Sequence, residues 1–205
     1  NHNNGTVIIN GNTLVSGSSN TTFGYIVIDD TYSLTGPPSG TMSIAFDFTN
    51  NGTFNNNAGT LVFNGEFQII GGTSPTLFEN LSINTGSNTS INTEGVTLAG
   101  VLLCDGILNA NSYLTMLSND SKTALIDGIG IGDVFGIINI QRYLHSGFGY
   151  KYFSSSFKAS TVNEFADDMD LNFWFPTFYR YDENRLFTGW LNYTNPDGVL
   201  VPMQG

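Results

Sequence analysis

The sequence predicts an all-β protein in two parts. We expect residues 1–125 to form a parallel β-solenoid (a β-helix), and residues 126–205 to form a small aromatic-rich antiparallel β-sandwich or sheet with one short helix. Three observations predict this arrangement. A seven-residue phrase recurs in the first part, short apolar runs alternate there with Gly, Asn and Ser, and the composition of the chain changes beyond it.

The repeated phrase is GTVIING at residues 5–11 and GTLVFNG at residues 59–65. The sequence that follows also recurs, because FGYIVID begins at Phe23 and FENLSIN begins at Phe78. The two copies are offset by 54 residues at the start and 55 at the end. Such a sequence repeat in a β-rich chain favours stacked coils or repeated sheets. We expect two or three coils in each 54-residue unit.

The strands expected in the first part are short. Residues 41–48 alternate, which places Met42, Ile44, Phe46 and Phe48 on one face of a single strand. The further expected strands are at 60–63, 66–70, 80–84, 96–98, 101–104, 107–108 and 114–116.

Two Asn-Gly pairs, Asn10-Gly11 and Asn64-Gly65, lie between apolar runs and leave two architectures open. A meander of hairpins would use them as tight reversals. A solenoid would use them as corners, since Asn and Gly tolerate left-handed backbone angles. We favour the solenoid because most strands span three to five residues and are followed by Gly, Asn or Ser.

A boundary near residues 120–145 separates the two parts. The first 121 residues contain no Lys or Arg, and 16 of the 27 aromatic residues fall between Tyr143 and Tyr193. In the second part, the glycine-rich residues 128–133 are expected to form a turn or cap, and Thr161 with Glu164 fits a capping box. The elements expected there are a strand at 137–143, a helix at 162–169 and strands at 173–175, 177–181, 187–193 and 198–203.

The charge pattern and the motifs exclude several classes of function. A net charge of −11 with so few basic residues argues against nucleic acid and anionic membranes as partners. No apolar run is long enough for a membrane-spanning helix, so we expect no membrane insertion. The single cysteine, Cys104, is expected to be a small buried apolar residue. No carboxylate pair or Gly-x-Ser-x-Gly motif stands out, so we expect no enzyme activity.

The candidate ligand-binding residues lie in the aromatic segment of the second part. They are Trp174, Tyr179, Arg180, Tyr181 and Trp190. Exposed Trp and Tyr rings stack on sugars, and neighbouring polar groups bond sugar hydroxyls. The alternative is that these rings fill the core of a small sandwich.

The candidate metal ligands are acidic. Asp167, Asp168 and Asp170 are close in sequence, and clustered carboxylates suit Ca²⁺, which is the one cofactor we consider. The alternative is that they are solvated charges of loops and helix ends.

A resemblance to a known family indicates a class of protein for this chain. The stretch from Gly59 to Met116, which contains GTLVFNGEFQIIGG and FENLSIN, resembles the repeat region of large Bacteroidota surface proteins. The segments from Ile140 to Ser155 and from Phe178 to Trp190 resemble the region after those repeats, although Ser156 stands where Pro is usual. Such proteins typically continue into a type IX secretion signal domain, so we expect this chain to be a fragment of a longer protein.

The resemblance implies an extracellular, surface-displayed, adhesin-like protein of which this chain is a rigid spacer and binding surface. The partners implied are glycans or proteins of the cell surface or matrix. One alternative is a carbohydrate-binding module of a secreted enzyme. Another is a structural surface protein that self-associates through open strand edges.

Overall fold

The computed structural model describes residues 4–16, 19–147, 149–152, 154–155, 157, 159–172 and 174–201. They form two compact units, residues 1–145 and 146–205. The division lies later in the chain than the expected 125/126, because the coils continue past that point. Strand β20 (Ile138–Ile140) pairs in parallel with β17 (Leu114–Met116) and so belongs to the first unit.

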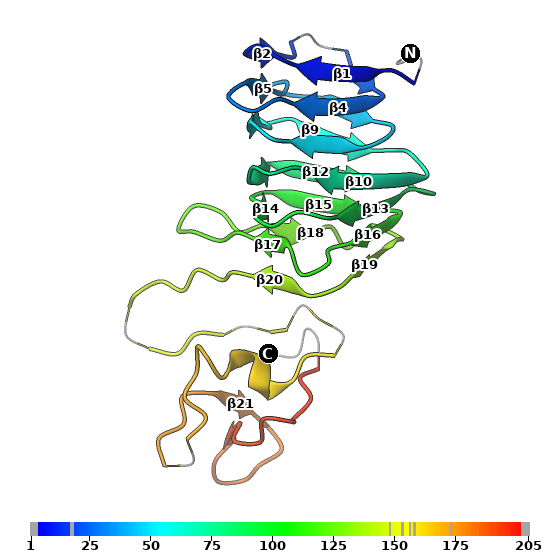
Figure 1. The fold of residues 1–205 in the computed structure, drawn as a ribbon. Coiled ribbons are helices and arrows are strands. Elements are labelled where there is room, and N and C mark those ends of the chain that lie inside the picture. The colour runs from blue at the N-terminus through cyan, green and yellow to red at the C-terminus, as the bar shows by residue number, and fades with distance from the viewer. Residues whose placement is uncertain are drawn as a thin grey trace. The chain divides into compact units, whose positions relative to one another are not determined.

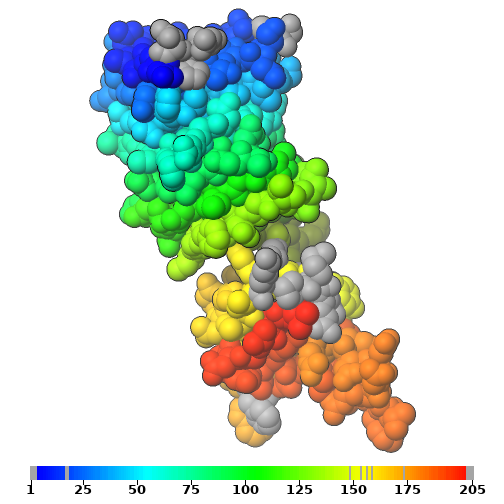
Figure 2. Space-filling model, turned by 90° about the vertical axis from the view of Figure 1, so that its right-hand side faces the viewer, coloured from blue at the N-terminus to red at the C-terminus, as the bar shows by residue number. Residues whose placement is uncertain are grey.

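The first unit is a parallel β-solenoid, as the sequence predicts. Successive strands belong in turn to three parallel sheets, so that three strands make one coil (Figure 1). The sheets contain seven, seven and six strands, which gives six complete coils and part of a seventh. In Figure 2 the side chains of these coils form successive layers that run from blue to yellow-green.

The strands fall into three named sheets. Sheet A contains β1 (Thr6–Ile9), β4 (Tyr25–Ile28), β7 (Phe48–Asn50), β10 (Phe67–Gly71), β13 (Asn88–Ile91), β16 (Ile107–Asn109) and β19 (Asp133–Phe135). Sheet B contains β2 (Thr13–Leu14), β5 (Ser33–Thr35), β8 (Thr53–Asn55), β11 (Thr76–Phe78), β14 (Val96–Leu98), β17 and β20. Sheet C contains β3 (Thr21–Phe23), β6 (Thr41–Ile44), β9 (Thr60–Phe63), β12 (Asn80–Ile83), β15 (Val101–Cys104) and β18 (Leu125–Ile126).

The core is built from columns of inward-facing side chains in register. Alternate residues of each strand point inward, and parallel pairing stacks each on its counterpart in the next coil. In sheet C one such column is buried through four successive coils, at Met42, Leu61, Leu81 and Leu102. Removing these apolar surfaces from water, at about 25 cal/mol per Å², is the main force that holds the coils together.

The strand expected at 41–48 is in fact two strands in different sheets. β6 ends at Ile44 and β7 begins at Phe48, with a corner between them. Phe46 lies at this corner, half-buried, and stacks on Tyr25 with ring centroids 4.7 Å apart. The chain can turn there because the buried Gln68 amide donates hydrogen bonds to the carbonyls of Ile44 and Phe46, at 2.8 and 2.7 Å.

The Asn64-Gly65 pair forms a corner between β9 and β10, not a hairpin. Gly65 does not adopt the left-handed backbone angle that the sequence led us to expect. Its role is close approach, since a Cβ atom at this position would lie 1.9 Å from the carbonyl oxygen of Ala45 in the preceding coil. Tight stacking of corners is therefore what requires glycine here.

The 54-residue sequence repeat does not correspond to a whole number of coils. The first copy of the phrase forms β1 in sheet A, and the second forms β9 in sheet C, two coils and two strands later. The structural repeat is a single coil, in which paired residues are from 18 (Val96 to Leu114) to 26 (Ile107 to Asp133) positions apart. In both copies the phrase pairs with the related strand of the next coil, β1 with β4 and β9 with β12.

The second unit contains a 3-10 helix and a two-stranded antiparallel sheet. The helix η1 (Val162–Phe165) begins after the capping box, in which the Glu164 carboxylate accepts a hydrogen bond from the Thr161 N–H. It is shorter than the expected 162–169 because Asp167 and Asp168, which favour turns, follow it.

The sheet of the second unit pairs β21 (Tyr179–Tyr181) with β22 (Trp190–Asn192). The expected strand at 173–175 is wrong for Trp174 and Phe175, which lie in a bend, and Phe173 is outside the described residues. Of the expected strand at 198–203, Val199 forms a single bridge, and residues 202–203 are outside the described residues. The core of the unit consists of Val162, Phe178 and Leu200, with Phe165, Met169, Leu171 and Tyr193 packed against it.

Candidate functional site

Three aromatic rings form a contiguous exposed group in the second unit, which we call the aromatic cluster: Tyr150, Tyr181 and Trp190. The rings of Tyr150 and Trp190 are stacked, with centroids 5.3 Å apart and an interplanar angle of 11°. Tyr181 meets Trp190 edge to face at 5.1 Å. The side chains are 74%, 57% and 38% exposed, so much of this aromatic surface faces solvent.

The β21–β22 pairing positions two of these rings. Tyr181 is directly opposite Trp190, which is where cross-strand aromatic pairs contribute most to a small sheet. Gly189 precedes Trp190 and lies against the Tyr181 ring. A Cβ atom at position 189 would be only 2.4 Å from that ring. The missing side chain at Gly189 therefore lets Tyr181 lie close against the backbone.

The structure brings some of the predicted ligand-binding residues together and not others. Tyr179, Tyr181 and Trp190 share one face of the two-stranded sheet, and strand alternation places Arg180 on the other face. Trp174 is exposed in the segment before β21, and its backbone N–H donates a hydrogen bond to Asn172 Oδ1 at 2.9 Å. The predicted set is therefore divided between two faces and a separate loop.

The aromatic segment is divided between the core of the second unit and its surface. Phe178 enters the core, where its ring lies 5.4 Å from that of Phe165 and 4.7 Å from that of Tyr193. Tyr179, Tyr181 and Trp190 stay exposed. Tyr150 belongs to the cluster although sequence analysis did not single it out, since no local pattern predicts its stacking on a residue so distant in the chain.

The aromatic cluster suits a flat, partly apolar ligand. Exposed rings at several angles offer both faces and edges for contact, and Trp and Tyr add an N–H and an O–H for hydrogen bonds. Asp182 follows Tyr181 and accepts a hydrogen bond from the Asn184 N–H at 3.1 Å, so the adjoining turn is held in a defined conformation. The arrangement therefore places an exposed aromatic surface next to a turn whose polar groups are held in place.

The three predicted metal ligands lie in the turn after η1 and just beyond it. Asp167, Asp168 and Asp170 are exposed, and the Asp170 carboxylate accepts a hydrogen bond from the Asn172 N–H at 2.8 Å. Among the residues that the structure describes, no group of three or more His, Cys, Asp or Glu side chains is arranged to hold a metal ion. The Ca²⁺ site stays a prediction from the sequence.

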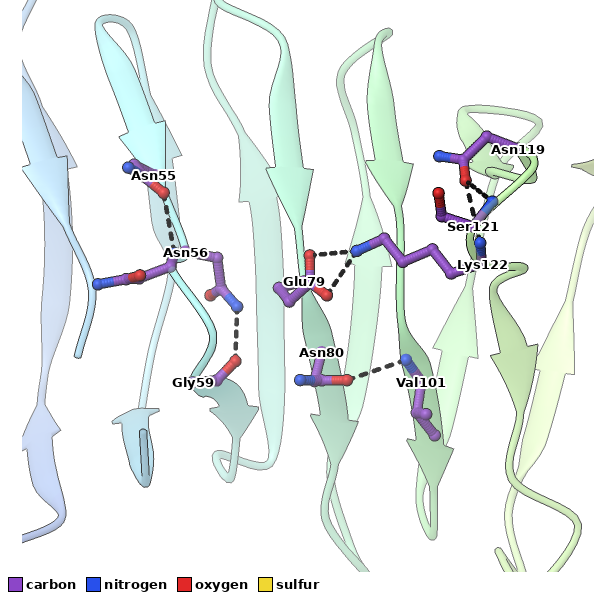
Figure 3. Close-up of polar contacts among 10 residues, drawn as sticks. Asn55, Asn56, Gly59, Glu79, Asn80, Val101, Asn119, Ser121 and Lys122 are labelled. Carbon is purple, nitrogen blue, oxygen red and sulfur yellow. Dashed lines mark hydrogen bonds and ion pairs between the residues drawn. The ribbon is translucent and has the colours of Figure 1, made fainter. Parts of the chain in front are cut away.

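Polar side chains on the solenoid connect neighbouring coils. Asn80 Oδ1 accepts a hydrogen bond from the Val101 N–H of the next coil at 3.0 Å, and Lys122 reaches back across that coil to Glu79, at 2.6 and 2.8 Å (Figure 3). Asn119 Oδ1 accepts hydrogen bonds from two backbone N–H groups of the same loop, those of Ser121 and Lys122. These contacts brace the solenoid.

The remaining reactive candidate is Cys104, which is buried as predicted. Burial raises the pKa of the Cys104 thiol, and because the thiolate is the nucleophilic form, this environment lowers its reactivity.

None of the helices in the described part of the chain has the length and apolar character to cross a membrane. Comparison with protein-family models, with curated proteins and with solved structures found no match to this chain.

Proposed function

We propose that this chain is a rigid spacer in an extracellular, surface-displayed adhesin-like protein, with a binding surface on its second unit. The observation that carries the proposal is the unbroken parallel ladder of the first unit. One outward-facing column of residues runs in register through every strand of sheet B, from Leu14 to Asn139. A solenoid whose coils are paired on three sides resists bending, and repeat proteins of this kind extend and display what is attached to them.

The composition supports an extracellular, non-enzymatic role. Charged residues make up 11% of the chain, and Asn, Gly and Thr provide the polar surface instead. Several polar side chains of the solenoid form contacts within and between coils, such as the Asn80 bond to Val101 and the Lys122 bonds to Glu79. The resemblance to surface repeat proteins points in the same direction.

The spacer role is tested by measuring distances along the solenoid. Spin labels on Leu14→Cys and Asn139→Cys would lie six strands apart in one column of sheet B, which at the usual strand spacing is about 29 Å. Because Cys104 is buried, it should escape labelling. We expect a single narrow distance distribution by pulsed electron resonance, and a distance about half as long for labels on Leu14→Cys and Leu77→Cys. A broad distribution would contradict a rigid spacer.

Carbohydrate binding is the second candidate function, and the exposed stack of Tyr150 on Trp190 favours it. Aromatic contacts are worth about 0.5–1.5 kcal/mol beyond buried area, so loss of the central ring should weaken glycan binding several-fold or more. A glycan array followed by calorimetry on the best binder would compare the wild type, Trp190→Ala and Phe187→Ala. Phe187 is exposed outside the cluster and serves as the matched control. Equal affinities in the three proteins, or no binding glycan, would reject this function.

A further inference from the structure

The chain contains four Asn-Gly pairs, and two of them occupy the same position in the repeated phrase. The four are Asn4-Gly5, Asn10-Gly11, Asn51-Gly52 and Asn64-Gly65. An Asn-Gly bond is chemically labile because glycine, without a Cβ atom, leaves its backbone nitrogen open to approach. The two copies of the phrase therefore present the same labile bond in two environments.

The reaction at such a bond is deamidation. The glycine nitrogen loses its proton and attacks Cγ of the asparagine, forming a cyclic succinimide and releasing ammonia. Water then adds to one of the two ring carbonyls. Opening at one carbonyl gives aspartate, and opening at the other gives isoaspartate, in which the main chain runs through the former side chain. The net change is one asparagine and one water converted to one acidic residue and one ammonia.

The Asn64-Gly65 bond is held in a conformation that opposes this attack. The Gly65 N–H donates a hydrogen bond to Gln68 Oε1 at 2.8 Å, which engages the nitrogen that would attack. Gln68 is 2% exposed and is itself fixed by its bonds to Ile44 and Phe46. The Gly65 backbone also packs closely against the preceding coil, because a Cβ atom at this position would be 1.9 Å from the Ala45 carbonyl oxygen.

The Asn10-Gly11 bond has none of these restraints. Leu14 stands three residues after Gly11, where the second copy of the phrase has Gln68. Within the described part of the chain, no group accepts a hydrogen bond from the Gly11 N–H. No heavy atom lies within 4 Å of a Cβ position on Gly11, and the Asn10 side chain is exposed.

We propose that Asn10 is a site of spontaneous, succinimide-mediated deamidation and that Gln68 protects Asn64 from the same reaction. Conversion at Asn10 would add one negative charge to a chain of net charge −11. Isoaspartate would also lengthen the main chain at the corner between β1 and β2. The modification would therefore alter the first described coil and leave the coil of Asn64 intact.

The test is peptide mapping by mass spectrometry during incubation of the folded 205-residue chain at mildly alkaline pH. The readout is the fraction of each Asn-Gly peptide converted to aspartate and isoaspartate. We expect conversion at Asn10 to be at least about tenfold faster than at Asn64, since breaking the buried hydrogen bonds of the Gln68 corner must precede reaction there. The same measurement in urea should give similar rates at both sites. Equal rates in the folded chain, or the same difference in urea, would overturn the proposal.

A variant tests the role of Gln68 directly. Gln68→Met keeps a similar shape but removes the acceptor of the Gly65 N–H. We expect faster conversion at Asn64 and an unchanged rate at Asn10, which serves as the internal control, with circular dichroism reporting that the chain is folded. No change at Asn64 in a folded variant would exclude protection by Gln68. If the variant does not fold, the comparison of the folded wild type with the urea-unfolded chain still decides the proposal.

Discussion

Two glycines in equivalent positions of the repeated phrase have different surroundings. Gly65 packs against the Ala45 carbonyl, whereas the space around Gly11 is open, and neither has a positive φ. We expect Gly65→Ala to reduce the free energy of unfolding by about 1–3 kcal/mol or more, because the coils must move apart. Gly11→Ala should change it by less than about 1 kcal/mol, in the stabilising direction. Urea denaturation of both variants measures this, and similar effects would contradict the packing argument.

A second prediction concerns the aromatic core of the solenoid. Phe78 is fully buried, with its ring 6.3 Å from that of Phe48 and 6.0 Å from that of Phe54. Truncation to alanine leaves a large cavity, so Phe78→Ala should cost about 3–5 kcal/mol of stability. Phe67→Ala is the matched control, because Phe67 is 71% exposed and its truncation should cost less than about 0.5 kcal/mol. Denaturant titration that gave comparable losses would place Phe78 outside the core.

The buried thiol predicts a pH dependence. Desolvation raises the pKa of Cys104 above its ordinary value of 9.0. The folded chain therefore keeps the thiol proton at pH values where the unfolded chain has lost it. The stability that the thiol contributes is full below pH 9.0 and falls as the pH rises through the raised pKa of the folded state. Stability measured from neutral to alkaline pH should decline more for the wild type than for Cys104→Ala. Parallel curves would mean that the thiol titrates normally.

At the scale of elements, the loop between β17 and β18 is closed at its base and tied to an earlier coil. Ser118 and Thr123 bridge its ends, and Lys122 pairs with Glu79, their side chains 45% and 31% exposed. Exposed ion pairs are weak, so we expect a coupling of about 0.2–1 kcal/mol that salt reduces. A double-mutant cycle with Lys122→Ala and Glu79→Ala measures it. Coupling that did not respond to salt would argue against a simple ion pair.

Most strands of the solenoid were predictable because their sequence pattern is local. The strands at 60–63, 96–98 and 101–104 lie where expected, since short apolar runs end at corner residues. The corner inside 41–48 was not predictable, because Phe46 continues the alternation while the chain turns. What permits the turn is the amide of Gln68, a residue of the next coil, and no local pattern contains that contact.

The candidate site was predictable only in part, for the same reason. Strand alternation places Tyr179 and Tyr181 on one face, and this much follows from the sequence of the strand alone. The cross-strand contact of Tyr181 with Trp190 depends on the register of β21 and β22, and the stacking of Tyr150 depends on a segment far away in the chain. These are tertiary contacts, which the composition of an aromatic segment does not specify.

At the scale of the whole molecule, the two compact units and the distribution of basic residues predict a proteolysis pattern. Residues 1–121 contain no site for trypsin, and the next basic residues are Lys122 and Arg142. Lys122 is held by Glu79, whereas Arg142 lies outside any strand, so we expect a resistant fragment of residues 1–142. Mass spectrometry of a limited digest checks this.

The variant Glu79→Ala sharpens this experiment, because it releases Lys122 while leaving Arg142 unchanged. It should accelerate cleavage after Lys122. Early cleavage after Lys122 in the wild type would show that the loop opens readily despite its contacts.

The placement of the two phrase copies in different sheets limits how a partner could use the repetition. GTVIING in sheet A and GTLVFNG in sheet C lie on different sides of the coil. A rigid partner that recognised this phrase could not engage both copies along one straight line, so the duplication provides no avidity to it. A partner that follows one side of the solenoid would instead meet a new chemical surface at every coil.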